Sequence, residues 1–430
     1  MTWRQAIERV RIRFARNSRV RMPTCARRIA KSTDLGGRLE ELEGRVVPTV
    51  TFDPTTHTLA VVGDKARPRD DVIDVSITRR GFVAVRVNAQ TIRSIRGVGR
   101  VPAASVFAIS VRGLEGNDTL SVPGQFQQAD GQITLDGGPG NDRIVGSSLS
   151  DMLFGGDGDD TLLAGAGDDT VTGGFGDDMI DGGLGTNLLR EIGDVDFTLS
   201  DSALAGLGSD SLSNIALVEL SGGFGDNVLD ASGFTGFAYL DEPIPVTLIG
   251  GDGNDTLVAA RGVSVLNGGR GDDTYLLNVA AGIDGNAQFV IDGDGIDLLD
   301  LSQVSSDHPI PVRVDLTKEN GEFVQVLRCP DGIPCGFSLT GLLENVIGGP
   351  AGDTLIGNLE SNLLTGGDGF DRIFGGDGDD TLNGGAGDDT VDGQQGADHL
   401  FGGPGFDRLV SDSVDPEVDV GPDSGQIFMT

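Results

Sequence analysis

Aspartate recurs every nine residues in two parts of this 430-residue chain. Carboxylates in such a pattern suit either the binding of a hard metal ion or acid–base chemistry. The stretch GGDGDDTLLAGAGDDTV at 155–171 returns almost letter for letter as GGDGDDTLNGGAGDDTV at 375–391, and each copy holds five aspartates in seventeen residues. These strips contain little apolar surface, so hydrophobic burial alone does not fold them.

The nine-residue register is continuous over six units from Gly137 to Arg190 and over seven units from Gly348 to Val410. The units share the template G-G-x-G-x-D-x-U-x, in which U is a large aliphatic residue. Position eight tests the pattern independently of the glycines, and all thirteen units pass: Ile144, Leu153, Leu162, Val171, Ile180, Leu189, Leu355, Leu364, Ile373, Leu382, Val391, Leu400 and Leu409. Side chains alternate along an extended segment, so we expect this aliphatic column to face inward.

The first six residues of each unit form the turn, where glycine tolerates positive φ and close backbone approach. One unit reverses the chain and two complete a coil, so unit n+2 lies over unit n. This geometry predicts columns of aspartates at position six of the units. The expected columns are Asp142, Asp160 and Asp178; Asp151 and Asp169; Asp353, Asp371, Asp389 and Asp407; and Asp380 and Asp398.

Like charges stacked about 4.8 Å apart repel by about 1 kcal/mol per pair in water, and by up to about 4 kcal/mol at a protein surface. Calcium reverses that repulsion, because it accepts six to eight oxygens from carboxylates and turn carbonyls. Magnesium requires a smaller octahedron, and zinc prefers His or Cys, which the repeats lack apart from His399. We therefore expect several calcium ions, in four candidate pairs of units in the first block and five in the second, and a chain that folds when calcium binds.

The two blocks resemble the RTX, or hemolysin-type, calcium-binding repeat family over 137–190 and 348–410. The resemblance implies a right-handed parallel β-roll, an all-β solenoid with calcium between the loops of alternate repeats. Weaker units of the same kind lie at 113–121, 222–230, 250–258, 268–276 and 292–300, and they add Asp255 and Asp273 to the expected metal ligands. Asn187 and Asn362 replace the aspartate in two units, which weakens the sites that they share.

The rest of the chain divides around the two blocks. Residues 1–31 carry ten Arg or Lys and one Glu, without the apolar region of a signal peptide. RLEELEGRVVPT at 38–49 resembles an LExLExR-type segment of exported bacterial proteins. The expected organisation is a leader or export segment at 1–47, a β-rich lead-in at 48–112, a first roll at 113–190, a degenerate β-solenoid at 191–347, a second roll at 348–410 and an acidic tail at 411–430.

Charge and composition exclude several partners. Beyond residue 31 the chain has 21 basic and 65 acidic residues, so it repels nucleic acid and anionic membranes. No run of eighteen apolar residues is present to span a bilayer as a helix. Cys329 and Cys335 flank a Pro/Gly turn, and either a small disulfide loop or two free thiols fits that spacing.

The sequence lacks the motifs of the enzymes that carry such repeats. His57, His308 and His399 stand alone without HExxH, and no G-x-S-x-G is present. The carboxylates recur identically in every unit, which fits ion binding better than many active sites. We therefore expect a secreted, non-enzymatic structural or adhesive module that contacts matrix, a cell surface or carbohydrate. The alternative is a calcium-dependent secreted hydrolase or a hemolysin-like toxin.

Overall fold

The computed structural model describes residues 49–63, 70–88, 90–93, 95, 98–123, 126, 133–235, 246–277, 287–303, 311–317, 327–328, 334–422 and 426–429. Within these ranges the chain forms β-strands, turns and one 3₁₀ turn, η1 (Ala103–Ser105), and no α-helix. None of the described residues forms a helix long and apolar enough to cross a membrane. The leader at 1–47 and Cys329 lie outside the described residues.

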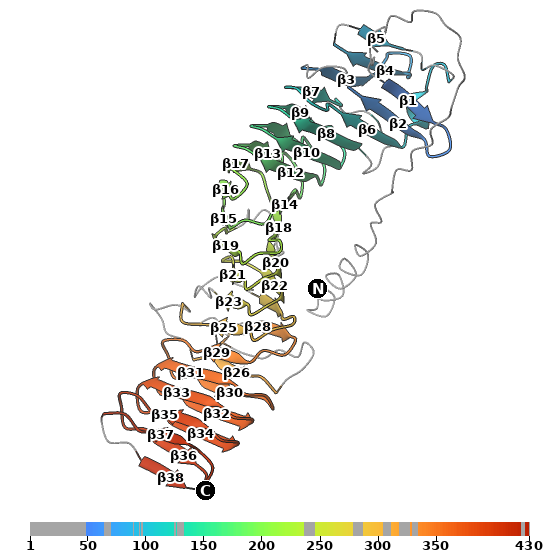
Figure 1. Cartoon of the computed structure of the whole chain (residues 1–430). Helices are drawn as coiled ribbons and strands as arrows, with labels where there is room; N and C mark the ends of the chain where they lie inside the picture. Colours follow the sequence, from blue (N-terminus) through green and yellow to red (C-terminus); the bar gives the residue numbers. More distant parts are fainter. Residues whose placement is uncertain are drawn as a thin grey trace, which may run out of the picture. The chain divides into compact units, whose positions relative to one another are not determined.

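Three sheets form the walls of a coiled structure (Figure 1). The first has thirteen strands in the order β1 (Thr49–Asp53), β2 (Thr58–Val62), β6 (Ala108–Arg112), β8 (Ile133–Pro139), β10 (Asp151–Asp157), β12 (Thr170–Phe175), β14 (Leu188–Ile192), β18 (Leu217–Ser221), β20 (Val246–Asp252), β22 (Ser264–Arg270), β24 (Ala287–Ile291), β28 (Pro334–Thr340) and β27 (Leu327–Arg328).

The second sheet has nineteen strands, linked one to the next in an open series. The series is β5 (Gln90–Ile92), β4 (Val83–Val87), β3 (Val72–Ile77), β7 (Thr119–Ser121), β9 (Arg143–Val145), β11 (Thr161–Leu163), β13 (Met179–Asp181), β17 (Ser209–Ser213), β16 (Ala203–Ala205), β15 (Phe197–Ser200), β19 (Val228–Gly233), β21 (Thr256–Val258), β23 (Thr274–Leu276), β25 (Leu298–Asp300), β29 (Asn345–Ile347), β31 (Leu363–Asp368), β33 (Thr381–Ala386), β35 (His399–Phe401) and β37 (Glu417–Asp419).

The third sheet takes over the wall opposite the second sheet in the C-terminal part. Its six strands are β26 (Arg313–Asp315), β30 (Thr354–Ile356), β32 (Arg372–Asp377), β34 (Thr390–Gln395), β36 (Arg408–Ser411) and β38 (Gln426–Met429).

Register within the repeats confirms that two units make one coil. Leu162 pairs in parallel with Ile144 before it and Ile180 after it, each eighteen residues away along the chain. Leu382 is paired in the same way with Leu364 and Leu400. The fold is therefore a parallel β-roll built from nine-residue repeats.

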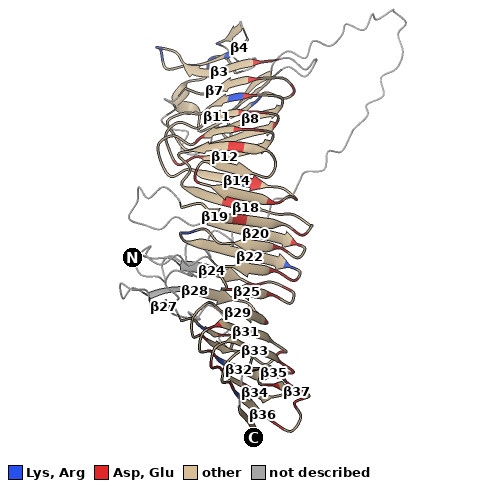
Figure 2. Ribbon diagram, turned by 90° about the vertical axis from the view of Figure 1, so that its left-hand side faces the viewer, with Lys and Arg blue, Asp and Glu red and all other residues tan. Residues whose placement is uncertain are grey.

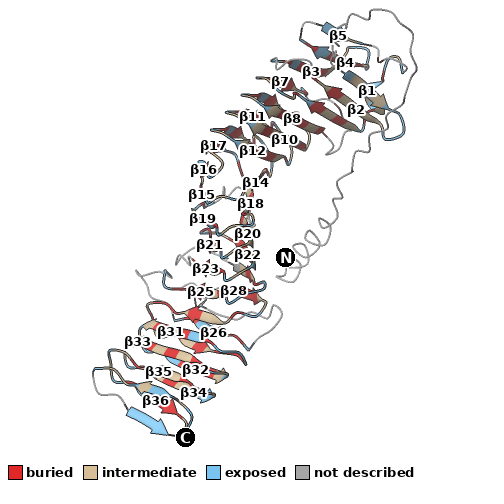
Figure 3. Cartoon of the chain, in the orientation of Figure 1, coloured by how far each residue is buried: buried red, intermediate tan, exposed pale blue. Residues whose placement is uncertain are grey.

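The aliphatic column fills the space between the two walls. All thirteen of its side chains are at most 1% exposed, which confirms the inward orientation. Buried and exposed positions alternate along the strands (Figure 3). Each coil thus contributes one large aliphatic residue from each wall to a narrow core.

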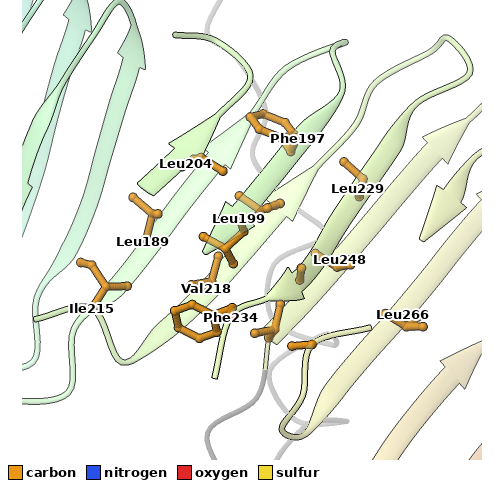
Figure 4. Close-up of a cluster of buried hydrophobic side chains, with 14 of the residues drawn as sticks. Leu189, Phe197, Leu199, Leu204, Ile215, Val218, Leu229, Phe234, Leu248 and Leu266 are labelled. Atoms are coloured by element: carbon orange, nitrogen blue, oxygen red, sulfur yellow. The ribbon is translucent and has the colours of Figure 1, made fainter. Parts of the chain in front are cut away.

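An antiparallel insertion interrupts the regular coils after the first block. β15 pairs with β16 and β16 with β17, so that Ile180 pairs with Leu212 thirty-two residues later. Phe197, Leu199 and Phe234 are buried here, and Figure 4 shows them with neighbouring leucines between the strands. A thicker aromatic core therefore replaces the repeat pattern where the glycine turns are missing.

Antiparallel strands flank the N-terminal end of both walls. β1 pairs antiparallel with β2, while β4 and β5 extend β3 in the same manner. The parallel ladders begin at β2 with β6 and at β3 with β7. The lead-in strands therefore cover the first open edges of the roll, where unpaired backbone groups would otherwise favour aggregation.

Replacing Leu162 by alanine tests the aliphatic column. We expect a loss of about 2–5 kcal/mol in the unfolding free energy, because the substitution leaves a cavity in a core one side chain thick. The matched control is the neighbouring Leu163→Ala, on the outer face, which is expected to cost less than about 1 kcal/mol. Urea unfolding of the calcium-loaded protein measures both, and equal losses would contradict the inward column.

Candidate metal centre

The position-six aspartates are buried rather than exposed at the turns. All thirteen predicted ligands are at most 2% exposed. Figure 2 shows acidic residues recurring along the edges of the roll, where the turns lie. Burial follows from the short turn, which folds the carboxylate back against the first glycine of its own unit: a Cβ at Gly155 would collide with Oδ2 of Asp160.

One carboxylate oxygen of nearly every predicted ligand accepts a backbone N–H from the neighbouring coil; Asp151 is the exception, because both of its oxygens accept from Ser147. The backbone N–H of Asp142 donates to Oδ1 of Asp160 at 2.6 Å, and that of Asp160 donates to Oδ1 of Asp178 at 2.8 Å. The same step joins Asp151 to Asp169 at 2.8 Å. The predicted columns are therefore real stacks, joined by N–H donors that the sequence pattern does not reveal.

The later columns repeat this arrangement. Along one edge each backbone N–H donates to Oδ1 of the next aspartate in the column. Asp353 donates to Asp371 at 2.6 Å, Asp371 to Asp389 at 2.8 Å, and Asp389 to Asp407 at 2.9 Å. Along the other, Asp380 donates to Asp398 at 2.9 Å. In the weaker units, Asp255 donates to Asp273 at 2.8 Å.

The second oxygen, Oδ2, is buried without a hydrogen-bond partner in ten of the predicted ligands. These are Asp142, Asp160, Asp169, Asp178, Asp255, Asp273, Asp371, Asp380, Asp389 and Asp398. Leaving a buried carboxylate oxygen unpaired is costly, so this recurrence favours a cation at the same place in each turn.

Backbone carbonyls line the space beside these oxygens. A Cβ on Gly156, where φ is +124°, would collide with the carbonyl oxygen of Gly138 in the preceding coil. A Cβ on Gly155 would meet the carbonyl of Gly173 in the following coil as well as Oδ2 of Asp160. This turn therefore forms a cradle of carboxylate and carbonyl oxygens that a side chain at Gly155 or Gly156 would fill.

Two predicted ligands differ because both of their oxygens are bonded. Oδ2 of Asp353 accepts the N–H of Gly349 at 2.6 Å, and Oδ2 of Asp151 accepts that of Ser147. In most units the second residue is a glycine with positive φ. Ser147 and Gly349 occupy this second position in their units, and neither has a positive φ. The turn N–H thus points at the carboxylate in these two units and takes the place that a cation would have in the others.

The two asparagine units satisfy the turn with their own amide. Oδ1 of Asn187 accepts the N–H of Asp169 at 3.1 Å, while its Nδ2 donates to the carbonyl of Asn214 at 3.0 Å. Nδ2 of Asn362 likewise donates to the carbonyl of Glu344 at 2.8 Å. In both units the uncharged Nδ2 group stands where other units have an unpaired carboxylate oxygen, so no buried negative charge has to be neutralised by a cation.

Burial and neighbouring carboxylates raise the pKa of the stacked groups. Burial chiefly, with the Asp142 carboxylate nearby, raises the pKa of Asp160 to about 7. Burial raises the pKa of Asp371 and Asp380 to about 7 and that of Asp169 to about 6. Burial thus disfavours the charged form of these groups, so either a proton or a bound cation stabilises them in the fold.

The columns also include residues that the sequence analysis missed as ligands. Asp118 and Asp210 extend the first column at each end: Asp118 donates to Asp142 at 2.6 Å, and Asp178 donates to Asp210 at 3.0 Å. Asp273 donates to Asp297 at 2.6 Å in the same manner. The shared signal is an aspartate two residues before a buried aliphatic residue. At Asp210 this signal follows Gly206 and Gly208 but lies outside the continuous register.

A second, exposed ladder runs in the opposite direction at position five. Oδ1 of Asp159 accepts the N–H of Asp177 in the following coil at 3.0 Å, and Oδ1 of Asp379 accepts that of Ala397 at 2.9 Å. These aspartate side chains are exposed, and their hydrogen bonds link successive turns on the outer side of the roll.

The donor set fits calcium. Each cradle offers only oxygen atoms, the ligand type that calcium prefers. In the described part of the chain, no three His, Cys, Asp or Glu side chains are grouped to hold one ion. Two stacked carboxylates and turn carbonyls therefore make up the available ligands, and carbonyls predominate.

Comparison with known families agrees with this geometry. The family model of the RTX calcium-binding nonapeptide repeat (four copies) matches residues 134–153, 154–189, 247–278, 347–382 and 374–409. These segments contain both regular blocks and the units around Asp255 and Asp273. No curated protein matches the chain significantly.

The raised pKa values predict how the calcium-free protein responds to pH. Carboxyl groups with a pKa near 7 in the fold and near 3.8 in the unfolded chain bind more protons when folded, so their stabilisation is lost as pH rises through about 4 to 7. In chelator we expect circular dichroism to show more strand signal at pH 5 than at pH 8, and calcium should reduce the difference. More strand signal at pH 8 in chelator would contradict the burial of these groups.

The Asp160→Asn variant tests whether Oδ2 of Asp160 binds a cation. Asn187 shows that an asparagine fits at the same position of the repeat. The amide keeps the acceptor for Asp142 and removes a buried charge. We therefore expect a loss of one or two bound calcium ions by calorimetric titration, because Asp160 faces a neighbour on each side. The control is Asp157→Asn in the same unit, which removes one exposed charge. If both variants bind as much calcium as the parent, Asp160 is not a ligand.

Proposed function

We propose that this chain, a protein of RTX calcium-binding nonapeptide repeats, is an exported structural module whose β-roll is completed by calcium and presents a surface for adhesion. The observation that carries the proposal is the set of buried, stacked carboxylates, ten of which have one oxygen bonded to an adjacent coil and the other without a partner. Such a column is poorly stable alone and well suited to a dication.

The aspartates, glycines and aliphatic residues of the repeat have different roles in the proposed calcium binding. Asp142, Asp160 and Asp178 supply carboxylates along one edge, and the glycines at positions one, two and four let carbonyls approach from adjacent coils. Bound calcium supplies two positive charges and six to eight coordination positions for oxygen. The aliphatic column holds successive turns in register, and the position-five ladder links them outside.

Calcium-dependent folding follows from the thin core. At an affinity typical of extracellular modules, about 10⁻⁴ to 10⁻³ M, a ten-fold excess of calcium adds roughly 1.4 kcal/mol per site. Several occupied sites together then contribute more to the unfolding free energy than the aliphatic column does. The chain stays unfolded where calcium is scarce and folds outside the cell, which suits an exported protein.

The described histidines support a non-catalytic role. Nδ1 of His57 lies 3.0 Å from the carbonyl oxygen of Ser105, and its ring packs 4.7 Å from that of Phe107. His399 lies on the outer face, with Nδ1 3.2 Å from the Glu417 carboxylate. The hydroxyl of Ser105 donates to the carbonyl of Pro102 at 2.7 Å, and no hydroxyl or thiol of the described residues is hydrogen-bonded to either ring.

Far-ultraviolet circular dichroism in chelator and in millimolar calcium tests the folding part of the proposal. We expect strand signal to appear with calcium and not with magnesium, because the cradles are large and carbonyl-rich. Equal strand content in both solutions would show that calcium does not complete the fold.

A retention assay tests the adhesive part. The calcium-loaded protein should remain on cells or matrix and be released by chelator, while a parallel hydrolase screen should find no activity. Magnesium at the same concentration is the control for ionic strength. Hydrolysis of any screened substrate, or retention that ignores calcium, would contradict the proposed role.

A further inference from the structure

Four arginines surround a hollow at the N-terminal end of the roll. Arg79, Arg80, Arg93 and Arg100 line a cavity of about 300 Å³ with Thr78, Phe82 and Val83. Figure 2 shows basic residues beside β3 and β4. We call this hollow the arginine pocket.

Backbone hydrogen bonds fix the segments that carry these arginines. The turn holding Arg79 and Arg80 is closed by Thr78, whose N–H donates to the carbonyl of Phe82 at 2.8 Å. The N–H of Val83 donates to Val101 at 2.9 Å, which holds the residue after Arg100 against β4. Arg93 directly follows β5, which pairs with β4. The pocket walls are therefore ordered before any ligand binds.

The arginines are unusual for so acidic a chain. The whole chain has a net charge of −35, yet none of these four forms an ion pair with a carboxylate of the described residues. Arg112, Arg190, Arg270 and Arg313 do form such pairs elsewhere. Four cations left together in one hollow favour an anionic ligand from outside the chain.

We propose that the arginine pocket binds a sugar-sized ligand carrying a phosphate or sulfate ester. Guanidinium groups form paired hydrogen bonds with tetrahedral oxyanions, and four of them match an ester group with three terminal oxygens better than a carboxylate with two. A volume of about 300 Å³ lies at the small end of ligand pockets. Phe82, which is half-buried, offers an apolar surface to the sugar ring.

The acidic body of the chain limits the ligand further. A long polyanion such as nucleic acid would extend past the lead-in strands and be repelled by the aspartate-rich turns of the roll. A compact anion or the end of a polymer therefore fits better. The pocket has no side chain suited to acid–base chemistry among its lining residues, so it binds rather than reacts.

Calorimetric titration of the full chain in millimolar calcium tests the pocket. The probes are glucose 6-phosphate and glucose 6-sulfate, with glucuronate as a carboxylate and glucose as a neutral comparison. We expect the two esters to bind, and Arg93→Gln with Arg100→Gln to weaken their binding by at least about ten-fold, since the double variant removes two charge-assisted hydrogen-bond donors. Preference between the esters identifies a phosphorylated or a sulfated source.

The control variant combines Arg143→Gln with Arg372→Gln, two exposed arginines outside the pocket and without ion pairs among the described residues. It removes the same charge and should bind both esters as the parent does. Failure of both esters to bind at millimolar concentration, or equal weakening in the two variants, overturns the proposal. Calcium stoichiometry, measured on the same samples, separates this failure from a failure of the metal sites.

Discussion

The structure depends on a buried carboxylate that is only half satisfied. At most turns of the two blocks, one aspartate oxygen accepts a backbone N–H from the adjacent coil, while the other lies against glycine and neighbouring carbonyls. The bonded oxygen fixes the stacking of the coils. The unbonded oxygen makes that stack unfavourable until the group is either protonated or bound to a cation.

The other features of the repeat follow from this constraint. Glycine at position one leaves room for the carboxylate, and glycine at position two turns its peptide so that carbonyl rather than N–H groups face the cradle. Ser147 and Gly349 show the alternative, because without positive φ the turn N–H bonds to Asp151 or Asp353 directly. The aliphatic column is only one side chain thick in each wall, so the fold relies on its turns more than an ordinary domain does.

Much of this was predictable from the period. The nine-residue register gave the inward column, the two-unit coil and the stacked aspartates, because each depends only on spacing and on strand alternation. The burial of the aspartates was not predictable, since it depends on the turn folding back onto Gly155 and its equivalents. The insertion around Phe197 was also missed, because no glycine stands between 194 and 205. The ladder member Asp210 was missed because its unit, with Gly206 and Gly208, lies outside the continuous nine-residue register. The arginine pocket depends on bringing together Arg79, Arg93 and Arg100, which no local motif relates.

Anomalous diffraction from crystals grown in calcium tests the central claim most directly. The account predicts peaks between successive coils, about 2.3–2.6 Å from Oδ2 of Asp160 and its equivalents and from turn carbonyls. No peak is expected beside Asn187 or Asn362. Cradles without peaks, or peaks confined to exposed carboxylates such as Asp159, would contradict it.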